Sequence, residues 1–331
     1  MQTARWKARV ATGVLSLLVS TGCGCAARLP VATPSLHRQT IAADVVPQPT
    51  VSETVFLRTR LDATAKKTPA AAADGGGGGD LSAAAQNPIA SNVSLPFENS
   101  FMFGAGPDND AAWVMNIQPV IPVPVGPVNL ITRPILPVMY MPGPVTGLPF
   151  IDGVPSGEDS ADQFGIGDLN VTTFVSPRNS KKIIWGVGPS VTFPTATDPL
   201  LGGGKWAIGP SLVALTIRKP WLVGCLVRHL WSFAGDDGRA DVNQLLVQPF
   251  LNYNLDDGWY LVTAPVFVGN WSQPSSERWT VPIGAGAGRI FKIGQQPVNV
   301  NAQVYYNVER PTDAPDWQLK FTVQFIFPKK S

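Results

Sequence analysis

Three segments in the second half of the chain alternate between apolar and polar side chains, and this pattern limits the fold more than any other feature. Over residues 244–255, one set of alternate positions is apolar and the other is rich in glutamine and asparagine. The same period of two recurs over 298–307 and 317–327. Because successive side chains of a β-strand point to opposite faces, each segment is predicted to be a strand with one apolar and one amide-rich face.

A proline-rich, almost uncharged segment precedes these strands. Residues 111–150 contain a single charged side chain, Arg133, and nine prolines. An interior proline destabilises a helix by about 3 kcal/mol, so membrane helices are excluded here in spite of the low charge. Extended structure is the regular alternative, with the prolines expected at edges or bulges.

Twelve segments are long enough to cross a membrane as tilted strands of roughly 9–11 residues. Longer and shorter connections alternate between them, as in membrane barrels that have long loops at one end and tight turns at the other. The predicted strands are 92–104, 111–125, 129–142, 165–178, 183–196, 205–219, 221–235, 242–255, 259–271, 279–294, 296–310 and 316–328.

Two features favour a membrane barrel over the alternative, a soluble β-sandwich with the same alternation. The polar face carries asparagine, glutamine and threonine rather than lysine and glutamate, which suits a wet interior. The apolar face carries aromatic side chains near strand ends, where membrane barrels have interfacial girdles; these are Trp231, Phe233, Tyr253, Trp317, Phe325 and Phe327. The predicted fold is therefore all-β, a twelve-stranded antiparallel outer-membrane β-barrel over residues 91–331 with a disordered N-terminal arm.

The first 27 residues are predicted to be an export signal. Three basic residues precede an apolar run over 10–19, and small residues follow it. This run is too short for a transmembrane helix. Two processing sites stay open: one before Cys23, where a lipobox-like sequence would place a lipid on that cysteine, and one after Ala27.

Residues 28–90 are predicted to be a low-complexity periplasmic tether. Five consecutive glycines at 75–79 lie between alanine-rich stretches, and sequence of this composition forms a flexible coil. The net charge of the whole chain is only +2, which gives no reason to expect a nucleic-acid partner.

Ten short stretches of the barrel region carry a resemblance to a known family. They are 94–99 (SLPFEN), 118–122 (QPVIP), 129–135 (NLITRPI), 165–169 (GIGDL), 185–189 (WGVGP), 193–197 (FPTAT), 231–237 (WSFAGDD), 248–253 (QPFLNY), 279–283 (WTVPI) and 325–329 (FIFPK). In this order they make residues 86–330 resemble the outer-membrane transporter-like family labelled "MetA-pathway of phenol degradation", some of whose members are mis-titled neuromedin U. The resemblance implies a barrel that transports small, apolar or aromatic solutes, and it brings no catalytic residue set.

The sequence contains no recognisable catalytic set, metal site or cofactor motif. The two histidines are His37, in the tether, and His229, whose strand parity places it on the lipid face, opposite to Ser232. Cys225 is the single cysteine outside the signal region, so neither a disulfide framework nor a cysteine-based zinc site is expected. Acidic residues in the predicted loops lack EF-hand spacing, and the glycine runs lack the phosphate-loop pattern.

Strand parity also predicts which side chains line the lumen: Arg133, Asp168, Arg228, Gln244, Gln248, Asn252, Asn299, Asn301, Gln303, Lys320, Thr322 and Gln324. Twelve strands leave a narrow lumen at most. The predicted function is passive movement of small solutes, with Arg228 and Lys320 biasing ion flow toward anions. The alternatives are a closed structural or surface-binding barrel, and a membrane-embedded lipid-modifying enzyme. The expected partners are outer-membrane lipid and a small solute.

Overall fold

The structure, a computed structural model, describes residues 85–149, 161–180 and 182–328 of the 331-residue chain. The predicted signal peptide, the candidate lipidation site Cys23, His37 and the predicted tether up to residue 84 lie outside the described residues. The roles assigned to these N-terminal segments therefore stay predictions.

The described residues form fifteen β-strands and three short 3-10 helices. The strands are β1 (Val93–Ala105), β2 (Asp110–Ile117), β3 (Ile121–Val125), β4 (Val128–Met141), β5 (Gln163–Ile166), β6 (Leu169–Pro177), β7 (Ile184–Phe193), β8 (Lys205–Arg218), β9 (Trp221–Gly235), β10 (Asn243–Asn254), β11 (Trp259–Thr263), β12 (Phe267–Asn270), β13 (Trp279–Ile293), β14 (Gln296–Glu309) and β15 (Trp317–Phe327). The helices are η1 (Pro199–Leu201), η2 (Asp256–Gly258) and η3 (Ser275–Glu277).

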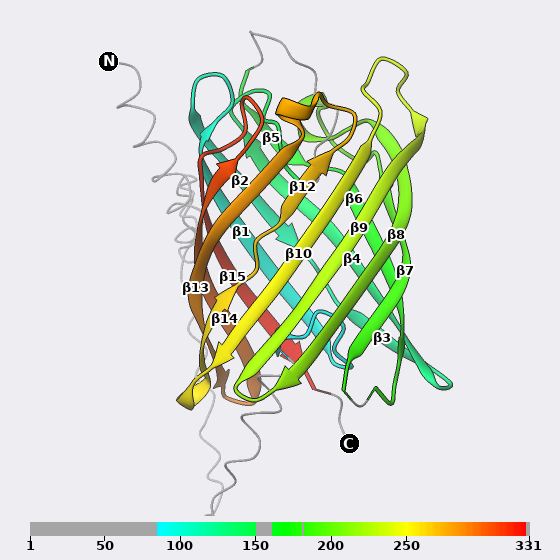
Figure 1. The fold of residues 1–331 in the computed structure, drawn as a ribbon, viewed down its shortest axis with the longest axis vertical. Coiled ribbons are helices and arrows are strands. Elements are labelled where there is room, and N and C mark those ends of the chain that lie inside the picture. The colour runs from blue at the N-terminus through cyan, green and yellow to red at the C-terminus, as the bar shows by residue number, and fades with distance from the viewer. Residues whose placement is uncertain (1–84, 150–160, 181, 329–331) are drawn as a thin grey trace, which may run out of the picture. The chain divides into compact units, whose positions relative to one another are not determined.

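The strands close into a barrel with twelve antiparallel staves, which confirms the predicted fold class (Figure 1). Three staves are interrupted once each, so β2 with β3, β5 with β6, and β11 with β12 make one stave per pair. Closure is made by β1 and β15, which pair from Val93↔Phe327 to Phe103↔Trp317. The tight connections lie at the end that holds Val93 and Phe327, the turn end; the longer connections lie at the opposite, loop end.

The outer surface of the barrel is apolar and has an aromatic girdle at each end. Exposed aliphatic side chains such as Leu212, Val223 and Leu319 lie between the girdles. The loop-end girdle contains Phe103, Phe164, Trp206, Trp231, Phe233, Trp271, Tyr306 and Trp317, and the turn-end girdle contains Trp185, Trp221, Trp259, Phe291 and Phe327. A closed barrel with an apolar band between aromatic girdles matches a lipid bilayer and its two interfaces. The protein is an outer-membrane β-barrel.

Within the part of the chain that the structure describes, no helix is both long enough and apolar enough to span a membrane.

The prolines of residues 111–150 lie mostly where a strand needs no N–H donor on that side. Pro119 falls in the break between β2 and β3, and Pro122 and Pro124 lie in β3, whose ladder partner is β4 alone. Pro127 lies in the tight turn between β3 and β4. Proline cannot donate a ladder hydrogen bond, so edges and breaks are the positions that tolerate it.

A second proline cluster interrupts the wall itself. On one side, β10 pairs with β11 up to Leu251↔Thr263 and with β12 from Val247↔Phe267, so 264–266 faces 248–250 without a ladder. On the other side, β13 pairs with β11 and with β12 and skips the same segment. Pro249, Pro265 and Pro282 lie at this level of three adjacent staves. The Ala264 N–H donates instead to Tyr305 Oη over 2.8 Å.

The proline break should be visible in hydrogen exchange. Amide protons that lack a ladder partner open to solvent more readily than paired ones. Pro265 has no amide proton, so the prediction concerns two residues: the Val266 amide, and to a smaller extent the Ala264 amide that bonds only to a side chain, should exchange faster than the amides of β11 and β12. These two strands flank the segment in the same stave and serve as the internal control. The measurement is hydrogen–deuterium exchange with peptide mass analysis on the folded barrel. Uniformly slow exchange across 259–270 would show that the wall is continuous here.

Candidate functional site

The lumen contains a cavity of about 290 Å³ that extends along the barrel and is bounded at both ends by chain segments inside the barrel. At the turn end its lining includes Ala85, Gln86 and Pro88, and at the loop end it includes Gly147 and Leu148. Between these limits, side chains from the inner faces of most staves contribute to the wall.

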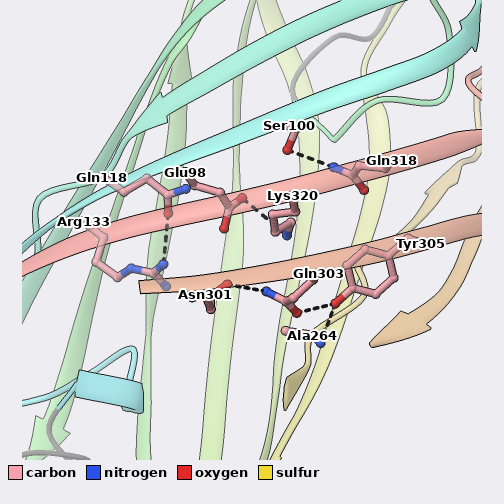
Figure 2. A network of polar contacts seen from close by, with 10 residues as sticks. All are labelled: Glu98, Ser100, Gln118, Arg133, Ala264, Asn301, Gln303, Tyr305, Gln318 and Lys320. Atoms are coloured by element: carbon pink, nitrogen blue, oxygen red, sulfur yellow. Dashed lines mark hydrogen bonds and ion pairs between the residues drawn. The ribbon is translucent and has the colours of Figure 1, made fainter. Parts of the chain in front are cut away.

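One wall of the cavity is polar, and it is formed mainly by β1, β14 and β15 (Figure 2). Gln303 is central in this wall: its Nε2 donates to Asn301 Oδ1 over 2.9 Å, and its Oε1 accepts from Tyr305 Oη over 2.5 Å. The Gln318 side chain donates to Ser100 Oγ over 2.9 Å. The first two bonds run along β14 and the third crosses from β15 to β1, so the polar face that the sequence predicted is organised as a network.

The network also contains an ion pair. Lys320 on β15 places its Nζ 3.4 Å from Glu98 Oε1 on β1, and the lysine side chain is almost fully buried. Among the described residues that line the cavity, Glu98 is the single carboxylate, against the basic side chains of Arg133, Arg228 and Lys320. The lining of the cavity therefore has an excess of positive charge.

The opposite wall is apolar, which the sequence analysis did not anticipate. Phe174, Leu226 and Phe250 line the cavity, and they belong to a buried cluster that also contains Ile89, Val120, Ile131, Val213, Leu215, Leu222 and Leu246. Phe250 fills the space above Gly224, where an added Cβ would come within 2.4 Å of the ring. The lumen is thus amphipathic, with amides on one side and hydrocarbon on the other.

Residues 85–90, the turn-end segment, lie inside the barrel. Ile89 is 3% exposed within the apolar cluster, and Ala85 is buried against Tyr260, Val262 and Ile326. The Gln86 side chain donates to Asn254 Oδ1 over 2.8 Å. These six residues were assigned to the tether by sequence, and their packing inside the barrel is a finding of the tertiary structure.

Residues 142–149, the loop-end segment, cover the cavity from the other side. Val145 and Leu148 are buried against Met102, Val114 and Met139 on the inner faces of β1, β2 and β4. The Leu148 carbonyl accepts from Gln244 Nε2 over 3.3 Å. Gly147 has a positive φ of 70°, and an added Cβ would lie 2.5 Å from Thr280 Oγ1 on the far wall, so a larger residue would not fit.

All of the side chains predicted to line the lumen point into the barrel. Those that line the main cavity are Arg133, Arg228, Gln248, Asn252, Asn299, Asn301, Gln303, Lys320, Thr322 and Gln324. Asp168 and Gln244 line a smaller cavity of about 30 Å³, which Arg228 also touches. Asp168 accepts backbone N–H bonds from Ala196 (3.0 Å) and Gly203 (2.7 Å), so it fastens the connection between β7 and β8. The part that the predicted lumen-lining side chains play in solute passage stays a prediction.

The described histidine lies on the outer face of the barrel. His229 Nε2 is 2.8 Å from Asn243 Oδ1, and its ring stacks on Trp231 with centroids 4.2 Å apart. Ser232 bonds instead to Asp241 Oδ1 and to the Val242 N–H, on the other side of the strand. Among the described residues, no group of three or more His, Cys, Asp or Glu side chains could hold a metal ion.

Comparison with known proteins identifies no family. No protein-family model matches the chain, and no curated protein matches it. The NanC porin aligns with a TM-score of 0.43 and 8% identity, over 71% of this chain and all of the porin. Outer membrane phospholipase A from Escherichia coli aligns at 0.39 and 13%, over 76% and 98% of the two chains. The toluene transporter TbuX from Ralstonia pickettii aligns at 0.38 and 12%, over 75% and 93%. Likeness at this level assigns neither a solute nor an activity.

The docking of the turn-end segment can be tested through Ile89. Truncation of a buried isoleucine to alanine removes about 2–5 kcal/mol of packing. We expect Ile89→Ala to loosen the segment and to raise the maleimide labelling rate of an Ala85→Cys reporter several-fold in a Cys225→Ser background. The label is located by peptide mass analysis.

Ser91, the exposed residue that follows the turn-end segment, provides the control: Ser91→Ala should leave the labelling rate unchanged. Equal labelling in Ile89→Ala and in its parent would mean that Ile89 does not hold the segment in the barrel.

Proposed function

We propose that the protein is a passive channel for small solutes with an apolar or aromatic body. The observation that supports this most directly is the amphipathic cavity on the path through the barrel, with an amide network on one wall and the Phe174–Phe250 cluster on the other. An apolar cavity of about 150 Å³ can hold benzene. The lumen cavity, at about 290 Å³, has room for a single-ring aromatic molecule with a polar substituent.

The polar wall supports passage rather than tight retention. Amide and hydroxyl groups can exchange hydrogen bonds with a passing solute, and these uncharged groups do not hold it by charge. The apolar wall lowers the cost of moving a ring through the barrel, because the ring leaves water on one face. These properties fit the solute class implied by the resemblance to the phenol-degradation transporter family.

The two segments at the ends of the cavity set a condition on this function. A solute can enter the cavity from one end only if the segment at that end moves aside. A full passage requires both the turn-end segment and the loop-end segment to move. The same packing is the specific observation that favours the second candidate, a closed structural or surface-binding barrel, in which the two segments stay in place.

Deletion of the turn-end segment separates these two functions. We expect Δ85–90 to accelerate the uptake of a neutral single-ring solute such as benzyl alcohol into proteoliposomes several-fold over the full chain, because the deletion removes Ile89 and Gln86 from the lumen. Deletion of six residues at 69–74 has the same length and should leave uptake unchanged. Heat-modifiable migration on gels verifies that each variant is folded.

The channel function would be contradicted if the wild type and Δ85–90, both folded, show neither uptake nor conductance. The closed structural or surface-binding barrel would then be the supported function.

A further inference from the structure

The charge of Arg133 is poorly satisfied within the protein. Its Nη2 lies 3.5 Å from Gln118 Oε1, at the limit of a hydrogen bond, and its Nε is buried without a hydrogen-bond partner. Among the described residues, Arg133 makes no ion pair within 4.0 Å. A guanidinium has five N–H donors, so most of its hydrogen-bonding capacity remains unused.

The nearby carboxylate is already engaged. Glu98 is close enough to attract Arg133, but its ion pair is with Lys320 on the neighbouring stave (Figure 2). The third basic side chain, Arg228, donates to Asn170 Oδ1 over 3.1 Å and to the Pro149 carbonyl over 3.0 Å. Of the three basic side chains in the lining, Arg133 therefore has the weakest set of polar contacts to the described residues, a single hydrogen bond at 3.5 Å.

An apolar surface begins one inward position away from this charge. Arg133 on β4 faces Thr172 on β6, and the next pair toward the turn end is Ile131 and Phe174. Both of these side chains are fully buried, and they belong to the cluster that contains Leu226 and Phe250. Inward side chains two residues apart on neighbouring strands are within reach of one small molecule.

From this arrangement we propose that the cavity binds a small carboxylate with a single ring, the carboxylate on Arg133 and the ring against the Phe174 cluster. A buried charge without a partner is unfavourable, and a bound anion removes that cost. Arginine matches a carboxylate with two parallel hydrogen bonds. This site would define the class of solute that the proposed channel carries. Its role in transport rests on the proposed channel function, whereas binding to the site can be measured without any transport.

The test compares benzoate with benzyl alcohol, a neutral molecule with the same ring, by calorimetric titration of the folded full chain in detergent micelles. Benzoate should bind the wild type more tightly than benzyl alcohol. Hydrogen bonds to a charged group contribute about 1.5–3 kcal/mol, so Arg133→Gln should weaken benzoate binding about 10- to 100-fold and leave benzyl alcohol within about twofold. Arg133→Lys keeps the charge without the paired donors and should fall between the two.

A matched control uses the other charges of the cavity. The double variant Glu98→Gln with Lys320→Gln removes one acid and one base, leaves the net charge of the lining unchanged, and should keep the preference for benzoate. Migration on gels with and without boiling verifies that each variant is folded. If Arg133→Gln does not fold, Arg133→Met takes its place.

Three results would overturn the site: no preference for benzoate in the wild type, equal benzoate affinity in wild type and Arg133→Gln, or equal loss of both ligands in Arg133→Gln. These failures are separable from failure of the channel. Uptake of benzyl alcohol without benzoate binding would support the channel function and contradict the binding site. Benzoate binding without any uptake would support the binding site and contradict the channel function.

Discussion

The structure depends first on closure of the backbone hydrogen-bond ladder around the barrel. In the hydrocarbon layer, water cannot satisfy an exposed N–H or carbonyl, so an open sheet edge is excluded. Pairing of β1 with β15 along eleven residue pairs removes the two edges that a linear array of strands would have. Closure also assigns each side chain to lipid or to lumen, because the two faces of a strand alternate. The girdles, the cavity and its charges all follow from this division.

The ladder is interrupted at the proline cluster of β10, the 264–266 segment and β13, and the chemistry of proline explains the interruption. Prolines at one level of β10, the 264–266 segment and β13 deprive neighbouring staves of donors where they would otherwise pair. The freed segment is held from inside, by Tyr305 of β14 and by packing of Ala264 and Val266 on the apolar cluster. Side-chain contacts across the lumen thus replace main-chain bonds within the wall.

The lumen is filled because its inner surface is partly hydrocarbon. A water-filled pore lined by Phe174, Leu226 and Phe250 would expose apolar area that packing can remove. Ile89 from the N-terminal side packs within this apolar cluster, and Leu148 from the longest connection packs against Met102, Val114 and Met139 at the loop end. What remains between them is a cavity lined by three basic side chains and one carboxylate among the described residues, and Arg133 makes no ion pair with any of these residues. The proposed solute class follows from that imbalance of charge and from the hydrocarbon beside it.

Sequence alone determined the number of staves and, in the segments where apolar and polar positions alternate, the face to which each side chain belongs, because a period of two is a local property of extended chain. It placed Gln303, Lys320 and Arg133 inside the barrel for the same reason. The apolar wall, the two inner segments and the partners of each charge were decided only by the tertiary structure. Gln86 meets Asn254 across 168 positions, and Gln244 meets Leu148 across 96. Contacts of this range depend on how the sheet curves and closes, and no repeat in the sequence encodes which inward side chains then face one another.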